Sequence, residues 1–183
     1  MNFHQTFLYC PKCSSNRFIT HNEKSKKCEA CGFVYYLNPS AACAAFILND
    51  DGHLLVCRRG KEPSKGLLDL PGGFTDFNET VEQAIAREVK EELNGEVILA
   101  RYLFSLPNDY LYSGMNIPTL DMFFECKLSD YKHLSPNDDV EAYFFLPISE
   151  INPALFGFKS IRKAVEIFIN TQPMKNKDEK LLG

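Results

Sequence analysis

The stretch 71–95 constrains this chain more than any other, because a glycine turn is followed by a helix that carries clustered acids. Apolar residues recur at helical spacing over 80–93, so this segment is predicted to be an amphipathic helix. At 100° per residue, Glu91 and Glu92 lie about 60° and 40° from Glu88, at the border of the apolar face. Like charges at a partly buried edge are costly unless a divalent cation neutralises them. Their carboxylate oxygens favour Mg²⁺ or Mn²⁺.

A second interpretation of the same helix needs no metal. Arg87 and Glu91 stand one helical turn apart, so they could pair on an exposed surface that is rich in glutamate. Helical spacing alone does not decide between the two interpretations.

The spacing around this helix resembles the signature of the Nudix hydrolase family. Gly73 is followed by five residues and Glu79, and seven further residues lead to the run Arg-Glu-Val-Lys-Glu-Glu at 87–92. Asn and Gly at 94–95 stand where the family pattern has Gly and an aliphatic residue. Asn tolerates the left-handed conformation at a helix end better than most residues, so this difference leaves the acids unaffected. The resemblance implies an α/β fold, an α/β/α sandwich around a mixed sheet.

The resemblance also implies a reaction and a role for each residue of the signature. The family cleaves nucleoside diphosphates linked to another moiety, by metal-assisted attack of water on phosphorus. Glu79 and Arg87 would form a supporting salt bridge. The implied ligands of the catalytic metal ions are three carboxylates and one backbone carbonyl, those of Glu88, Glu91, Glu92 and Gly73.

The catalytic base is expected to be a carboxylate that takes a proton from the attacking water. Glu91 and Glu92 lie in the signature, and Glu91 is a candidate. In many relatives a later loop supplies the base, which favours Glu141 in the segment Asp-Asp-Val-Glu at 138–141. The alternative is that the two aspartates of this segment only cap a solvated turn.

The N-terminal segment has two C-x-x-C pairs and few aliphatic residues. Fourteen residues separate the pairs, and four thiolates at this spacing can close a tetrahedral shell around Zn²⁺. The alternative is four reduced cysteines without a metal. The pattern resembles the zinc ribbon family, and the predicted ligands are Cys10, Cys13, Cys28 and Cys31.

We expect three parts: a zinc ribbon at 1–38, the hydrolase domain at 39–172 and a flexible tail at 173–183. Strands are predicted at 41–48, 53–58, 97–106, 121–128 and 142–146, and a second amphipathic helix at 159–170. The three remaining cysteines lie singly in apolar runs and are predicted to be small buried side chains; they are Cys43, Cys57 and Cys126.

A zinc ribbon directly before a Nudix domain resembles the NADH pyrophosphatase subgroup. The implied substrate is a dinucleotide such as NADH, ADP-ribose or a nucleotide sugar. The subgroup carries a Trp-containing motif after the signature, whereas this chain has no Trp and has 104–114 at that place. Tyr110 and Tyr112 could stack on a base and Arg59 could reach phosphate, with core packing and a solvated loop as the alternatives.

The formal net charge of −4 over 183 residues disfavours nucleic acid as a partner, except as a capped RNA end. We expect a cytoplasmic protein without a membrane segment, which acts on a nucleotide-type small molecule. The sequence does not decide between a monomer and a homodimer. The alternative function is a regulatory or RNA- or protein-binding module with weak or no catalysis.

Overall fold

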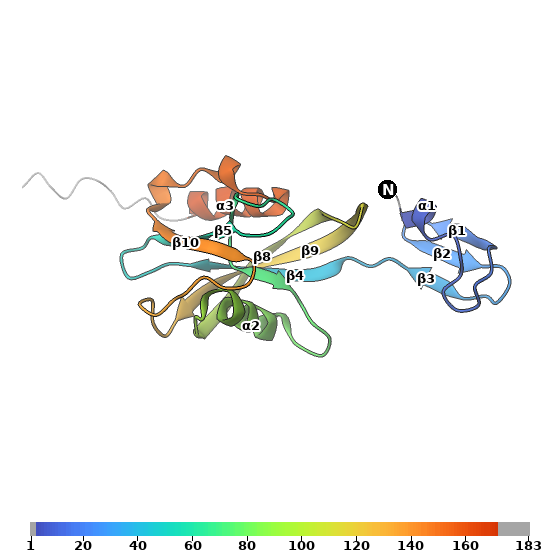
Figure 1. The fold of residues 1–183 in the computed structure, drawn as a ribbon, viewed down its shortest axis with the longest axis horizontal. Coiled ribbons are helices and arrows are strands. Elements are labelled where there is room, and N and C mark those ends of the chain that lie inside the picture. Colours follow the sequence, from blue (N-terminus) through green and yellow to red (C-terminus); the bar gives the residue numbers. More distant parts are fainter. Residues whose placement is uncertain (1–2, 172–183) are drawn as a thin grey trace, which may run out of the picture.

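The computed structural model describes residues 3–171, in which a small N-terminal sheet precedes a larger α/β domain (Figure 1). The small sheet has the strand order β1-β2-β3, and its preceding helix is a single turn. The bounds are α1 Phe3–Thr6, β1 Phe18–Asn22, β2 Ser25–Cys28 and β3 Val34–Tyr36. The predicted tail at 173–183 lies outside the described residues.

The larger domain contains two sheets, one of four strands in the order β7-β4-β9-β8 and one of three in the order β10-β5-β6. β4 and β9 run parallel, while the other pairs are antiparallel, so the predicted mixed sheet is confirmed. The bounds are β4 Ser40–Ile47, β5 Leu54–Arg59, β6 Leu68–Asp69, β7 Gly72–Phe74, α2 Val81–Leu93, β8 Val97–Tyr112, β9 Met115–Leu128, β10 Val140–Leu146, η1 Ile148–Glu150, η2 Pro153–Leu155 and α3 Lys159–Thr171.

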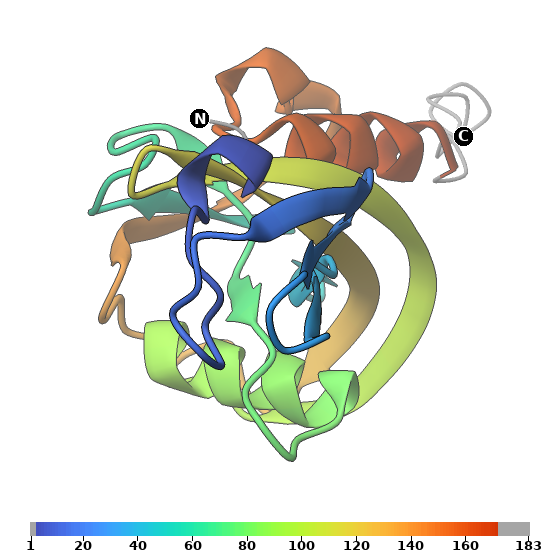
Figure 2. The same ribbon diagram turned by 90° about the vertical axis from the view of Figure 1, so that its right-hand side faces the viewer.

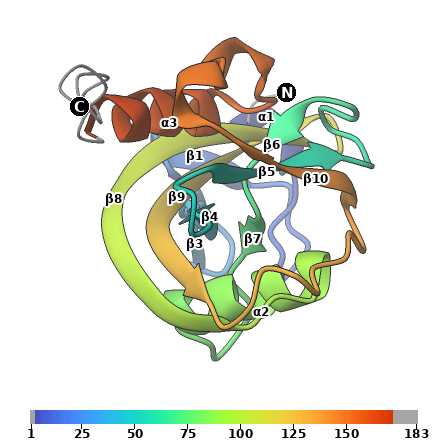
Figure 3. The same ribbon diagram turned by 90° about the vertical axis from the view of Figure 1, so that its left-hand side faces the viewer.

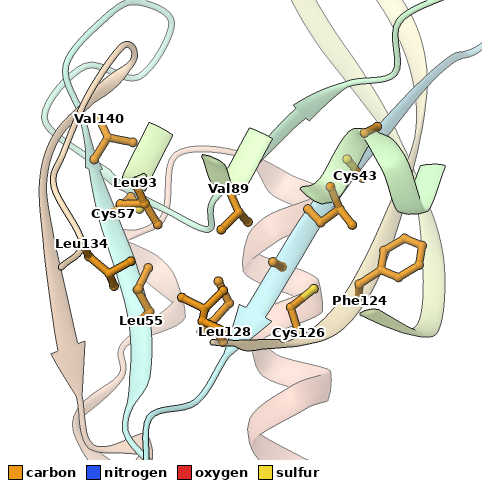
Figure 4. Packing of buried hydrophobic residues seen from close by; sticks show 14 residues of the cluster. Cys43, Leu55, Cys57, Val89, Leu93, Phe124, Cys126, Leu128, Leu134 and Val140 are labelled. Atoms are coloured by element: carbon orange, nitrogen blue, oxygen red, sulfur yellow. The ribbon is translucent and has the colours of Figure 1, made fainter. Parts of the chain in front are cut away.

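Two helices cover opposite sides of these sheets, with α2 on one side and α3 on the other (Figures 2 and 3). Each helix buries its apolar face in a separate core cluster. Val89 and Leu93 of α2 pack toward β4, β5 and β9, together with the three single cysteines (Figure 4). On the other side, Phe168 of α3 stacks on Phe46 of β4 with ring centroids 4.0 Å apart. The predicted α/β/α arrangement is therefore confirmed.

The two amphipathic helices form where the apolar spacing predicts them. Thr80 caps α2: its hydroxyl accepts from the backbone N–H of Gln83, whose side chain accepts in return from the backbone N–H of Thr80. Asn94 ends the helix in the left-handed conformation with φ of 55°. The substitution of Asn for Gly at the end of the signature is thus accommodated by the backbone.

The hairpin of β8 and β9 is longer than the sequence predicts. The strand predicted over 97–106 continues to residue 112, and its partner begins at residue 115 rather than 121. Pro107 and Pro118 argue against strands at the sequence level because proline donates no ladder hydrogen bond. Pro107 lies on the edge strand β8, and Pro118 precedes the residues of β9 that pair with β4, so each lacks a neighbouring strand on one side.

Candidate active site

A cavity of about 330 Å³ opens between the two sheets and extends from the acids of α2 to the start of α3. Six of the residues predicted for the site line it: Gly73, Glu88, Glu91, Glu92, Arg59 and Tyr110. It is also lined by residues that sequence reasoning did not identify, among them Asp69, Asn108, Thr119, Asp121 and Phe158. Thr119 and Asp121 share one strand, but the others come from separate strands and loops, and no local spacing in the sequence connects them.

Arg87 organises the acid-rich side of the cavity. Its Nη2 donates to Glu79 at 2.7 Å and to the carbonyl oxygen of Phe74 at 3.0 Å. Its Nη1 donates to Glu88 at 2.9 Å and to Glu91 at 3.0 Å. One guanidinium therefore connects the loop before α2 with two glutamates of the helix. The ion pair of Arg87 and Glu91, which the metal-free interpretation predicts, is present together with the acid cluster.

Glu92 is the most buried of the three glutamates, with 7% of its surface exposed. Its Oε2 accepts the backbone N–H of Gly72 at 3.0 Å. Burial raises the pKa of Glu92 well above its ordinary value, and burial also raises the pKa of Glu88, although Arg87 opposes the second shift. A buried carboxylate without a cationic partner is the donor type that a hard divalent cation stabilises, so these residues fit Mg²⁺ or Mn²⁺.

The short strand β7 brings the glycine turn against α2. Gly72 has φ of +150°, and a Cβ there would overlap the carbonyl of Cys43 and lie 2.8 Å from Cα of Ala44. A Cβ at Gly73 would overlap the carboxylate of Glu88, with Cδ at 2.6 Å. Gly72 is therefore required by the neighbouring backbone, whereas a side chain at Gly73 would displace the carboxylate of Glu88.

Arg59 lies in the cavity wall, where Nη1 donates to Oδ2 of Asp69 at 2.8 Å and Nε donates to the carbonyl oxygen of Pro63 at 2.8 Å. Its guanidinium lies 4.9 Å from the ring centroid of Phe158. Asp69 is 7% exposed, and burial raises its pKa to about 6 although Arg59 lowers it. Both members of this ion pair line the cavity, and Arg59 brings a guanidinium into a wall that is otherwise rich in carboxylates.

The loop before β10 contributes two aspartates to the same cavity. Asp138 and Asp139 line it, and both accept from Nζ of the exposed Lys61, at 2.7 and 2.6 Å. Glu141 is exposed and is not among the side chains that line the cavity. Tyr112 lines a neighbouring cleft, which Phe74 and Tyr110 share with the main cavity.

A second candidate site lies in the N-terminal sheet. All ligand atoms of its four cysteines lie within 4.8 Å of one another, and the Sγ atoms of Cys10 and Cys31 are 3.7 Å apart. Cys13 and Cys28 are separated by 3.6 Å. Sulfurs bound to one tetrahedral Zn²⁺ at about 2.3 Å lie about 3.8 Å apart, so this geometry fits zinc.

Comparison with known proteins places this geometry in context. A model of the NUDIX domain matches residues 38–166. The NAD-capped RNA hydrolase NudC of Vibrio vulnificus (strain CMCP6) is 33% identical over 103 residues, which are 56% of this chain and 39% of that protein. The ADP-ribose pyrophosphatase of Methanocaldococcus jannaschii is 42% identical over 67 residues, 37% of this chain and 39% of that protein.

Among solved structures, that of a NUDIX hydrolase from Nitrosomonas europaea matches with a TM-score of 0.70 and 24% identity, covering 88% of this chain and 90% of the other. At this identity the likeness concerns the fold. This chain spans about two fifths of the length of the two curated relatives described above. Within residues 3–171, no helix has the length and apolar character that crossing a membrane requires.

Proposed function

Because this chain belongs to the Nudix family, we propose that it is a Mg²⁺-dependent hydrolase that cleaves the pyrophosphate bond of a nucleoside diphosphate linked to another moiety. The observation that carries the proposal is the shared wall of one cavity, where the three signature glutamates meet the Gly73 turn. Arg87 and Glu79 hold that turn against the helix. A cavity lined by a cation-binding acid cluster and by a partly buried arginine suits a diphosphate.

The residues that would hold Mg²⁺ are the carboxylates of Glu88, Glu91 and Glu92 and the carbonyl oxygen of Gly73. Bound there, the metal would neutralise the diphosphate and lower the pKa of a water nucleophile. Arg87 Nη1 donates to one oxygen each of Glu88 and Glu91, so the second oxygen of each carboxylate would coordinate the cation while Arg87 keeps the side chains in place. Arg59, oriented by Asp69, would bind a phosphate oxygen.

For the proton acceptor we propose Asp139 of the loop before β10 or Glu141 at the start of that strand, with Glu91 as the alternative. The position of Glu141 in the sequence favours this residue, while Asp139 is the one of the two that lines the cavity. Asp139→Asn and Glu141→Gln distinguish them. The variant that lacks the base is expected to lose kcat by about 100-fold with little change in KM, because general base catalysis contributes on that scale.

The substrate is proposed to contain an adenosine diphosphate unit, as in ADP-ribose or NADH. The similarity to an ADP-ribose pyrophosphatase and to an NAD-capped RNA hydrolase supports this class. A small molecule is favoured over a capped RNA end, since the net charge of −4 repels a phosphate backbone. Zinc-binding thiolates and buried free cysteines suit the reducing conditions of a cytoplasm.

The test is hydrolysis of ADP-ribose, NADH, NAD⁺ and nucleotide sugars in Mg²⁺, with products identified by mass. Glu92→Gln is expected to lower turnover by at least about 100-fold, because it removes one charge from the metal site. Glu82→Gln is the matched control, since Glu82 is exposed in the first turn of the same helix and lies outside the cavity lining. No turnover by the wild type, combined with tight binding of one ligand, would favour the regulatory module instead.

A further inference from the structure

A carboxylate that does not belong to α2 lines the cavity beside the start of α3. Asp121 of β9 is 8% exposed and lines the cavity close to the start of α3. In the signature-based description of the site this residue has no role. Its position is determined by the sheet, because β9 places Asp121 beside Ala42 of β4 and Leu106 of β8.

Two buried hydroxyls orient this carboxylate. Oδ1 of Asp121 accepts from Oγ1 of Thr119 at 2.6 Å, and Oδ2 accepts from Oγ of Ser160 at 2.5 Å. Both hydroxyl residues are 3% exposed. Within residues 3–171, Asp121 takes part in none of the ion pairs. Each carboxylate oxygen accepts about two hydrogen bonds, so capacity for a further donor remains on both oxygens.

A side-chain amide accompanies the carboxylate on the same face of the hairpin. Asn108 of β8 pairs with Thr119, and residues opposite each other in an antiparallel pair project to the same face. Thr119 and Asp121 are two residues apart on one strand, so they share that face. Asn108 lines the cavity together with both of them. This end therefore offers a carboxylate acceptor next to an amide that can both donate and accept.

Aromatic rings form the neighbouring wall. The rings of Tyr110 and Phe158 lie 5.6 Å apart between centroids, and both line the cavity. Phe74 meets Tyr110 edge to face at 5.4 Å. A flat ligand can stack on such faces while its edge reaches hydrogen-bonding groups. A phosphate would be repelled by Asp121, whereas the N–H groups of a nucleobase would be attracted to it.

We propose that Asp121 and Asn108 form a subsite for the adenine base, in which Asp121 accepts a hydrogen bond from the exocyclic amine. Ser160 and Thr119 are positioning residues that hold the carboxylate. Asn108 donates to the adjacent ring nitrogen, and Tyr110 and Phe158 supply stacking surfaces. The inference rests on the proposed function, since it takes the diphosphate to lie at the α2 end of the same cavity.

The experiment compares ADP-ribose with inosine diphosphate ribose, which carries a carbonyl in place of the amine. An acceptor would then face the carboxylate, so the wild type is expected to prefer ADP-ribose by about 10- to 100-fold in kcat/KM. Asp121→Asn keeps the shape but offers an N–H donor to that carbonyl. Its preference for adenine is expected to vanish or invert. Asp109→Asn is the control, because Asp109 is an exposed acid of β8 outside the cavity lining.

Two further measurements distinguish a failure of the adenine subsite from a failure of the proposed function. The binding of AMP and IMP without Mg²⁺, measured by calorimetry, tests the subsite independently of hydrolysis. If the wild type hydrolyses neither diphosphate, that lack of hydrolysis counts against the proposed function and not against the subsite. Ser160→Ala retains Asp121 and is expected to weaken AMP binding more than IMP binding. The inference is wrong if the wild type and Asp121→Asn prefer adenine to the same degree. It is also wrong if the substitutions weaken the binding of AMP and IMP equally, because that result would indicate a contact with the ribose.

Discussion

Arg87 and Glu79 lie eight residues apart and are joined by two hydrogen bonds, from Nη2 at 2.7 Å and from Nε at 3.2 Å. The same guanidinium also reaches Glu88 and Glu91. The segment from Gly73 to Glu79 and the helix that carries the acids are thus connected through one side chain. Arg87 is a positioning residue, because it contacts the proposed metal ligands and not the reacting atoms.

Replacing Arg87 with Ala is expected to lower kcat/KM for ADP-ribose by about 100-fold, since small displacements of a catalytic constellation have effects of this size. The half-saturating Mg²⁺ concentration should also rise, because Glu88 and Glu91 lose the donor that orients their carboxylates. Arg87→Lys keeps the charge without the four-partner geometry and should give an intermediate effect. Unchanged Mg²⁺ dependence in the Ala variant would contradict the positioning role.

Substitution of the two glycines of the turn is expected to have different effects, on activity for Gly73 and on stability for Gly72. Gly73→Ala should retain the fold but displace Glu88, so activity is expected to fall by about 100-fold with a small change in unfolding temperature. Gly72→Ala should destabilise the protein, because its Cβ would meet the backbone of β4 at a positive φ. Thermal unfolding and steady-state kinetics measured on both variants separate the effects. Equal loss of stability in both would contradict this assignment.

Because the pKa of Asp69 is raised in the folded protein, the free energy of unfolding is expected to depend on pH. Burial raises the pKa of Asp69 from 3.8 to about 6, so the folded protein binds its proton more tightly than the unfolded chain does. The contribution of this group to stability is therefore full below about pH 4, falls as pH rises to about 6 and is constant above. The fall is on the order of 3 kcal/mol. The Asp69→Asn variant should not show this fall in stability with pH.

Denaturant unfolding of both proteins between pH 4 and 7, without added Mg²⁺, measures this difference. Asp69→Asn also removes the partner of Arg59, but that loss alters the absolute stability and not the slope assigned to Asp69. Parallel pH profiles for the two proteins would show that Asp69 does not titrate in this range.

The geometry of the four-cysteine cluster indicates that each chain binds one Zn²⁺. Cys31→Ser should lower the bound zinc and unfold the N-terminal sheet, since its few buried residues include two of the ligands, Cys10 and Cys28. Cys126→Ala is the control, because Cys126 is buried in the α2 core away from this cluster. Metal analysis by emission spectrometry gives the stoichiometry. Full zinc content in Cys31→Ser would exclude that thiolate as a ligand.

Local spacing in the sequence was sufficient for two features of this protein. The period of apolar residues and the capping box define α2, and one helical stripe then places Glu88 and Glu92 together whatever the rest of the fold does. The two C-x-x-C pairs likewise define two tight turns that each hold two cysteines, whereas the contacts Cys10–Cys31 and Cys13–Cys28 that join the turns span 21 and 15 residues. The helix and each turn depend on residues that are close in the chain.

Only the tertiary structure decided the remainder of the site. Asp121 meets Ser160 across 39 residues, and Arg59 meets Asp69 across a strand boundary, contacts that depend on strand order and register. The length of the β8–β9 hairpin, which carries Asn108, also follows from pairing that single-strand patterns do not specify. The acids proposed to bind metal are thus encoded locally, whereas the groups proposed to choose the substrate are assembled by long-range packing.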